Sequence, residues 1–155
     1  MKKNGNPFGE AFTSAAKGLD VLGGRIVAFQ SSLPSVGVGA IKNREDVRVY
    51  GRKGEVTMWF PDANQPAYKK LGQYCVEKQI SVDLISCCNG HDQQKSNGTK
   101  PAVTSSFADV ATIGTISKLT GGDVLNFSSF NIKSKRNTER LKREMLRILT
   151  NDVAL

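Results

Sequence analysis

The glycines that follow the first apolar run of the sequence are spaced almost as they are in a phosphate-binding loop. Gly37-Val-Gly39-Ala-Ile-Lys42 begins like GxGxxG, in which glycines let backbone amides approach a pyrophosphate. Lys42 stands where the third glycine is required, and Pro34 separates the glycines from the run. The P-loop motif is absent as well. These departures argue against a dinucleotide site and against nucleotide hydrolysis.

Cysteine, histidine and carboxylate side chains are the other candidates for chemistry. Cys88 and His91 have the residue types of a nucleophile and its base, but they lie in a polar segment that neither fixes their geometry nor tunes their pKa values. The three cysteines lack CxxC spacing, so they encode neither a disulfide framework nor a closed zinc site. The acidic residues form no ligand cluster at a recognisable spacing. We therefore predict no catalytic residue, no metal site and no cofactor, and we expect reduced, buried thiols.

Positive charge is concentrated near the end of the chain. The segment from Lys133 to Arg147 holds seven basic residues against Glu139 and Glu144, and seven minus two gives five of the eight net positive charges. Acidic lipid, nucleic acid and an acidic protein are all suitable partners for such a segment, and a solvated helix face is the simplest alternative. No interleaved aromatics or nucleic-acid-binding motif is present, so we expect no nucleic-acid partner.

The apolar pattern predicts four helices and three strands in alternation, and these elements must position the candidates above. The expected order is a helix from Phe8 to Leu22 with Asn6 as N-cap and Gly23 at its end, a strand at 25–30, a helix that starts near Pro66 and ends before Gln79, a strand at 80–86, a helix from a cap at Ser106 to Leu119, a strand at 123–127, and a helix after Asn137 or Thr138. Strands separated by helices pair in parallel through right-handed crossovers. The predicted fold class is α/β, a three-layer sandwich with a mostly parallel sheet.

Burial and domain organisation follow from the same pattern. The strand at 25–30 is apolar enough for burial on both faces, and the last helix should bury one stripe, formed by Leu141, Met145, Ile148 and Leu149. The polar segment 87–104 is predicted to be a flexible insertion. Three strands are few for such a sheet, so we interpret residues 1–155 as part of one domain. No apolar run approaches the roughly 20 residues of a membrane span.

Several segments occur together and in one order: GGRIVAFQSSLPSVGVGAIKNRED, AYKKLGQYCVEKQISVDLI, FADVATIGTISKLTGGDVLNF and the leucine-rich basic helix after them. Together they resemble the trunk domain of the Sec twenty-four family, the cargo-binding subunit of the COPII inner coat. The resemblance covers roughly residues 8–150. It implies a von Willebrand A-like fold, of which this chain would form the last three βα units.

The resemblance also implies a role in transport from the endoplasmic reticulum to the Golgi. The chain would be a structural and cargo-adaptor component, not an enzyme. Its partners would be the Sec twenty-three coat subunit, a Sar-family GTPase assembly and the cytosolic tails of cargo proteins. The expected location is cytoplasmic, peripheral on the endoplasmic reticulum and on COPII vesicles. The family's zinc finger would lie upstream, so no cofactor is expected here.

Two groups of residues are the candidate sites under this interpretation. A partner-facing loop would contain Leu33, Pro34, Gly37, Gly39, Lys42 and Arg44. A basic surface near acidic membrane would contain Lys133, Lys135 and Arg136. The alternative function is a free-standing adhesion module of the von Willebrand A type, which binds a ligand through a metal ion.

Overall fold

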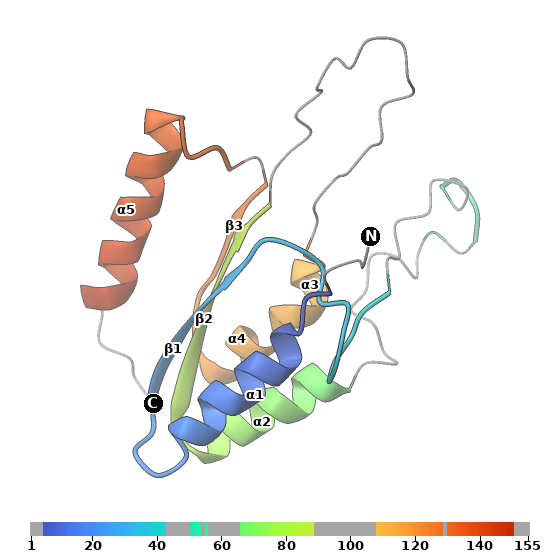
Figure 1. Cartoon of the computed structure of the whole chain (residues 1–155), viewed down its shortest axis with the longest axis vertical. Coiled ribbons are helices and arrows are strands. Elements are labelled where there is room, and N and C mark those ends of the chain that lie inside the picture. The colour runs from blue at the N-terminus through green and yellow to red at the C-terminus, as the bar shows by residue number, and fades with distance from the viewer. Residues whose placement is uncertain are drawn as a thin grey trace.

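The computed structural model describes residues 5–42, 50–53, 55, 66–88, 108–128 and 130–150. These residues form three strands and five helices (Figure 1). In chain order the elements are α1 (Phe8–Gly18), β1 (Gly24–Gln30), α2 (Ala67–Glu77), β2 (Ile80–Cys87), α3 (Val110–Ile113), α4 (Thr115–Thr120), β3 (Val124–Phe127) and α5 (Lys135–Thr150).

The three strands form one parallel sheet in the order β1-β2-β3. Strand β1 pairs with β2 along its full length, from Gly24 opposite Ile80 to Gln30 opposite Ser86. Strand β3 pairs with the second half of β2, ending with Phe127 opposite Cys87. Because each crossover contains a helix, the predicted parallel α/β fold is confirmed.

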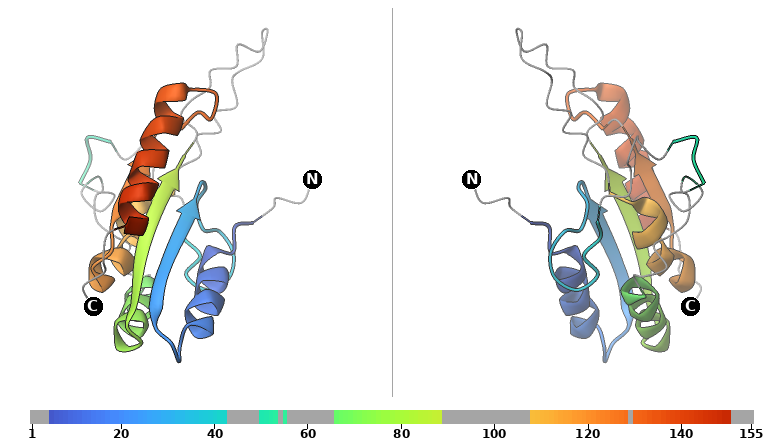
Figure 2. Two further views of the ribbon diagram at one scale, coloured as in Figure 1. Left: turned by 90° about the vertical axis from the view of Figure 1, so that its left-hand side faces the viewer. Right: turned by 90° about the vertical axis from the view of Figure 1, so that its right-hand side faces the viewer.

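Helices cover the sheet from both sides, which gives the three layers visible in Figure 2. Helices α1 and α2 lie on one side and α5 lies on the other. Alternate side chains of β2 serve the two sides: Val82 and Leu84 belong to the main core with α1, α2 and α4, whereas Ile85 packs with Phe127 and Ile148 beneath α5. Strand β2 is therefore buried on both faces.

A buried carboxylate connects the three strands on the α5 side. Asp83 is fully buried; its Oδ2 accepts a hydrogen bond from Arg25 Nε at 2.5 Å, and its Oδ1 accepts one from the Asp123 amide at 2.8 Å. Arg25 Nη1 also donates to the carbonyl of Ile148, near the end of α5. This network links β1, β2, the start of β3 and the last helix.

The predicted end and the predicted N-cap of the first helix were wrong. Helix α1 ends at Gly18, and Leu22 is 87% exposed in the turn that follows. The Gly23 amide donates to the Leu19 carbonyl at 2.8 Å with Gly23 at φ +66°, so the helix closes one turn earlier than expected. Asn6 is not the N-cap, because Pro7 takes that position without a side-chain cap.

The burial expected of β1 and of the last helix also needs correction. Phe29 in β1 is 54% exposed, since it lies on the α5 side, where α5 is the only described helix. Helix α5 starts at Lys135, earlier than expected, and Ile148 is its only buried residue. Leu141 and Met145 are partly buried as predicted, but Leu149 is 64% exposed.

The segment between β2 and β3 differs in detail from the prediction. Cys87 belongs to β2, and Cys88 is buried, whereas residues 89–104 lie outside the described part of the chain. The predicted single helix is two short ones joined at Gly114. Helix α3 begins after Asp109, whose side chain accepts a hydrogen bond from the Thr112 amide. The predicted cap at Ser106 lies outside the described residues.

Candidate functional site

The first candidate site is the β1 loop, residues 31–42, which follows the carboxyl end of β1. Two backbone hydrogen bonds fold this loop back on itself: Ile41 donates to the Pro34 carbonyl at 2.8 Å, and Ala40 donates to the Gly37 carbonyl at 3.2 Å. The turn requires positive φ at two positions, +79° at Gly37 and +71° at Gly39. Glycine adopts this conformation at little cost, which explains the glycine spacing in the sequence.

The start of α1 holds one side of the β1 loop. Asn6 Nδ2 donates to the carbonyl and to the hydroxyl of Ser32, at 3.1 and 3.0 Å, and the Ser35 amide donates to the Asn6 carbonyl at 3.0 Å. The Val38 amide donates to Glu10 Oε1 at 3.1 Å. A carboxylate therefore occupies one of the amides that a phosphate would need, and this arrangement disfavours the phosphate-loop interpretation.

Helix α2 holds the other side of the β1 loop through Tyr68. The Tyr68 hydroxyl donates to the Gly39 carbonyl at 2.8 Å, and its ring lies 6.3 Å from the ring of Phe8. Tyr68 is 1% exposed, and burial, with a smaller contribution from the charge of Asp109, raises its pKa to about 12. The loop is thus fixed to two helices, which restricts its conformation.

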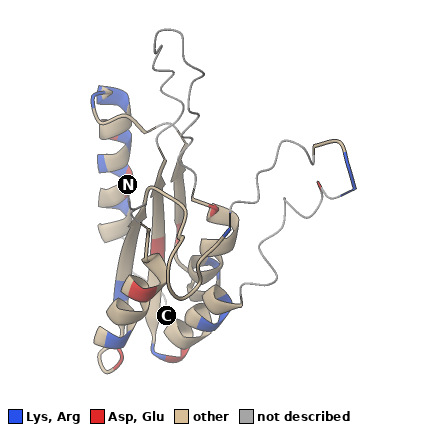
Figure 3. Cartoon of the chain, turned by 45° about the vertical axis from the view of Figure 1, so that its right-hand side comes forward, with Lys and Arg blue, Asp and Glu red and all other residues tan. Residues whose placement is uncertain are grey.

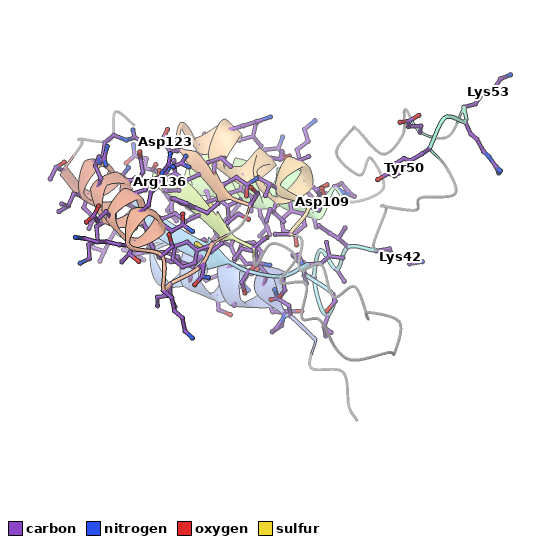
Figure 4. All side chains as sticks on the ribbon, turned by 90° about the horizontal axis from the view of Figure 1, so that it is seen from above. Lys42, Tyr50, Lys53, Asp109, Asp123 and Arg136 are labelled. Atoms are coloured by element: carbon purple, nitrogen blue, oxygen red, sulfur yellow. The ribbon has the colours of Figure 1, made fainter. Side chains whose placement is uncertain are left out.

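The predicted partner-facing residues divide into two sets. Leu33 is partly buried against the main core, Pro34 is almost fully buried and Gly39 is buried, so these three shape the loop. Gly37 and Lys42 are exposed. Figure 4 labels Lys42 on the side of the molecule away from α5. Arg44 lies outside the described residues.

Two exposed valines of the β1 loop were missed in the sequence. Val36 and Val38 are 51% and 46% exposed, and they flank Gly37. A signal was available: Gly37 and Gly39 mark the tip of a turn, and apolar side chains next to such glycines have little core within reach. These valines and Lys42 are the largest of the exposed side chains in the loop.

The second candidate site is the beginning of α5, where Lys133, Lys135 and Arg136 are all exposed (Figure 3). Lys135 lies 3.8 Å from Glu139, but both side chains are well exposed, and such pairs contribute little stability. No acidic residue occupies the first turn of this helix. Cations therefore lie at the positive end of the helix dipole, where they oppose helix formation.

The remaining chemical candidates are parts of the scaffold. Cys75 and Cys88 are buried, Cys87 is partly buried, and all three are free thiols. Burial raises the pKa of Cys75 to about 11, which keeps the thiol protonated. Cys88 Sγ lies 3.4 Å from the Ser86 hydroxyl, and its suggested base, His91, lies outside the described residues.

Comparison with known proteins decides the family of this chain. The family model described as the Sec23/Sec24 trunk domain matches residues 1–95. The chain belongs to this family. Its curated relatives include "Protein transport protein SEC24 A" of Arabidopsis thaliana, which is 32% identical over 148 residues, covering 95% of this chain and 12% of the relative. "Protein transport protein Sec24A" of Homo sapiens is 28% identical over 147 residues, covering 94% of this chain and 12% of the relative.

A solved structure agrees with the family assignment. The human COPII-coat protein Sec24c matches 90% of this chain and 17% of its own, with 27% identity and a TM-score of 0.70. The three-stranded parallel sheet with helices on both sides is consistent with the expected von Willebrand A-like arrangement. The chain spans about one eighth of the length of the curated relatives above.

The described residues of this trunk-family chain show neither a metal cluster nor a membrane-spanning helix. Within the described ranges, there is no group of three or more His, Cys, Asp or Glu side chains that could hold a metal ion. Among the same residues, every helix is too short or too polar to cross a membrane.

Proposed function

We propose that this chain is a scaffold segment of a COPII coat subunit that adapts cargo for transport from the endoplasmic reticulum to the Golgi. The observation that carries the proposal is the match to the human COPII-coat protein over 90% of the chain, together with the trunk-family model. Relatives named as protein transport proteins support it. The chain acts by protein–protein interaction and has no catalytic role. It works in the cytoplasm, at the surface of the endoplasmic reticulum and of COPII vesicles.

The β1 loop is the proposed contact with another coat subunit. Loops that carry binding residues are useful when a rigid scaffold positions them, and this loop is fixed to α1 and α2. Val36 and Val38 supply apolar contact and Lys42 supplies charge. The partner in this proposal is the Sec twenty-three subunit, in an assembly that also contains a Sar-family GTPase and the cytosolic tails of cargo proteins.

The beginning of α5 is the proposed contact with acidic membrane. Lys133, Lys135 and Arg136 are exposed, and two of them oppose the helix dipole. A sequence optimised for helix stability alone would place acids there. Attraction to anionic lipid gives these cations a function that offsets the cost, at about 1 kcal/mol for each basic residue near the surface.

A binding assay with the Sec twenty-three subunit tests the loop contact. The tagged chain is immobilised, and the subunit is titrated against the wild type and against the double variant Val36→Asp with Val38→Asp. The control is Val21→Asp with Leu22→Asp, which changes two residues that are 93% and 87% exposed in the turn before β1, at the opposite end of that strand.

The loop variant should bind at least about tenfold more weakly. It removes apolar contacts and buries two new charges at the interface, and the combined cost in binding free energy typically exceeds about 1.4 kcal/mol. The turn variant should bind like the wild type. If the wild type does not bind the subunit, the coat proposal fails. Equal loss in both double variants would remove the loop as the contact.

A further inference from the structure

Helix α5 separates its arginines from its lysines. Arg136, Arg140, Arg143 and Arg147 follow one another at intervals of four, three and four residues, which places them on one flank of a helix with 3.6 residues per turn. We call this flank the arginine stripe. Lys135 and Lys142 are seven residues apart and lie on the other flank. The charge of α5 is therefore not one uniform face.

The part of the arginine stripe from Arg147 to Arg140 runs along β3. Arg147 Nη2 lies 2.9 Å from Asp123 Oδ2, immediately before the strand, and the Arg140 guanidinium lies 5.0 Å from the ring centre of Phe127, the last residue of the strand. Because α5 and β3 run in opposite directions, Arg143 falls between these two contacts. Seen from above, Arg136 and Asp123 are labelled on the same side of the molecule (Figure 4).

Strand β3 is an edge of the described sheet. The strand order places β2 on one side of it and no described strand on the other. An edge strand offers unpaired backbone N–H and C=O groups to an added strand. Side chains of an added strand alternate between the two faces, so every second one would lie on the α5 side, beneath the arginines.

Arg147 shows which chemistry this stripe favours. It binds two carboxylates at once, with Nε 3.0 Å from Glu144 Oε2 and Nη2 2.9 Å from Asp123 Oδ2. Arg136 and Arg143 are exposed, and no ion pair joins either of them to the described residues. The planar arginine fork suits bidentate binding of carboxylates, whereas a diffuse attraction to lipid would use lysine as well.

We propose that the outer edge of β3 and the arginine stripe bind an extended acidic peptide segment of a partner protein. The peptide adds a strand to β3, and carboxylates at every second position bind Arg143 and Arg140. This site is separate from the β1 loop and does not depend on membership of the coat. A chain that bound no coat subunit would still bind the peptide.

Fluorescence anisotropy with a defined probe tests the proposal. The probe is a fluorescein-labelled eight-residue peptide of alternating glutamate and valine, and its counterpart replaces each glutamate with glutamine. The full chain is compared with Arg140→Gln/Arg143→Gln and with the matched control Lys135→Gln/Lys142→Gln, which removes the same charge from the other flank. Circular dichroism of each variant checks that α5 is retained.

The arginine double variant should lose about fivefold to twentyfold in affinity for the peptide, as expected for the loss of two exposed ion pairs. The lysine double variant should lose less than about twofold. Arg140→Lys/Arg143→Lys keeps the charge and should still lose about threefold, because lysine cannot bind a carboxylate in the bidentate manner. The glutamine peptide should bind about tenfold more weakly than the probe.

Three results would overturn the proposal. If the arginine and lysine double variants lost equal affinity for the peptide, the attraction would be a diffuse electrostatic field and not a specific site. Full affinity in the lysine-for-arginine variant would remove the bidentate contact. Phosphatidylserine vesicles that discriminate between the two pairs, with a peptide that does not, would assign the stripe to lipid.

Discussion

At the scale of single residues, the loop contact depends on how Tyr68 and Gly39 meet. The tyrosine hydroxyl binds the glycine carbonyl, and the ring fills the space that a side chain on Gly39 would need: an added Cβ would lie 2.9 Å from Tyr68 Cζ. Backbone conformation and packing therefore require glycine here for two separate reasons. The phosphate-loop pattern in the sequence is a consequence of this packing.

Alanine substitutions at Gly39 and at a second glycine separate the cost of the backbone conformation from the cost of packing. Gly39→Ala should lower the free energy of unfolding by about 2–4 kcal/mol, combining a left-handed backbone cost of roughly 1–2 kcal/mol with overpacking against Tyr68. Gly121→Ala is the matched control, because Gly121 has φ +70° but no atom lies within 4 Å of an added Cβ. It should cost only the backbone part. Urea denaturation measures both, and equal losses would contradict the packing argument.

The raised pKa of Tyr68 predicts a loss of stability in alkali. Burial raises this pKa to about 12, whereas an unfolded tyrosine titrates near 10. The unfolded chain therefore releases its proton first, so the stabilising contribution is complete below about pH 10 and is lost as the pH rises to about 12. Two pKa units correspond to about 2.7 kcal/mol, which is the largest decrease expected from this group.

Tyr68→Phe should remove this alkaline decrease and cost about 1 kcal/mol at neutral pH for the lost hydrogen bond. Cys75 contributes a decrease of the same sign between about pH 9 and 11 in both proteins, so the difference between the two curves isolates Tyr68. Tyr50→Phe, at a residue that is 52% exposed, is the control. A decrease that persists unchanged in Tyr68→Phe would contradict the assignment.

At the scale of elements, α5 is attached to the sheet through few contacts. Ile148 is its one buried residue, and Arg25 binds the Ile148 carbonyl from β1. The next residue, Leu149, is 64% exposed. One helix thus carries two adjacent aliphatic side chains with opposite environments, which allows a direct comparison.

Ile148→Ala should destabilise the chain by about 2–4 kcal/mol, since it leaves a cavity against Ile85 and Phe127. Leu149→Ala should change stability by less than about 0.5 kcal/mol, because an exposed side chain leaves no cavity. Thermal unfolding followed by circular dichroism measures the difference. Equal effects would mean that Leu149 is covered in solution.

The start of α5 offers a test in which stability and membrane binding change in opposite directions. Arg136→Glu should raise the free energy of unfolding by about 0.5 kcal/mol, because it places an acid at the positive end of the helix and four residues before Arg140. The variant should bind more weakly to vesicles that contain phosphatidylserine. Vesicle binding of the wild type should decrease steeply with added salt. Co-sedimentation with vesicles measures it.

Lys17→Glu is the control for this charge reversal. It makes the same change in net charge, but in the last turn of α1, where the cation favours the helix. It should therefore lower stability and leave vesicle binding nearly unchanged. Vesicle binding that responds equally to both variants, or that ignores salt, would reject a membrane surface at α5.

The order and type of the elements could be predicted from the sequence, because each strand and helix has a clear apolar period. Val124–Phe127 and Ala67–Glu77 agree closely with the predicted strand and helix. The exposure of Phe29 and Leu149 could not be predicted, since it depends on which elements lie beside β1 and α5. The outward valines of the β1 loop required knowledge of the turn formed by Gly37 and Gly39. Local periodicity fixes which side of an element is apolar, but not whether another element covers it.

At the scale of the whole molecule, the described sheet has two edges with different surroundings. The β3 edge lies beside the arginine stripe. The β1 edge has one charged residue, Arg25, and its guanidinium is drawn toward Asp83. Strand β1 contains no proline and no lysine, the usual means of protecting an edge strand from other strands. Within the strand, Phe29 is 54% exposed and presents apolar surface.

Because of this unprotected edge, we expect the isolated chain to associate with itself through β1. Sedimentation velocity should show an average mass that rises above 16.8 kDa as the concentration increases from about 10 to 100 µM. The net charge of +8 opposes association, so added salt should strengthen it by screening the repulsion.

Phe29→Lys places a charge in the edge strand β1 and should keep the chain monomeric under the same conditions. Val21→Lys adds the same charge at a residue that is 93% exposed in the turn before β1, and it should associate like the wild type. A wild-type mass that stays constant with concentration and salt would mean that residues of the same chain cover this edge. Association that is equal in all three proteins would place the contact elsewhere, since only the lysine at position 29 lies in β1.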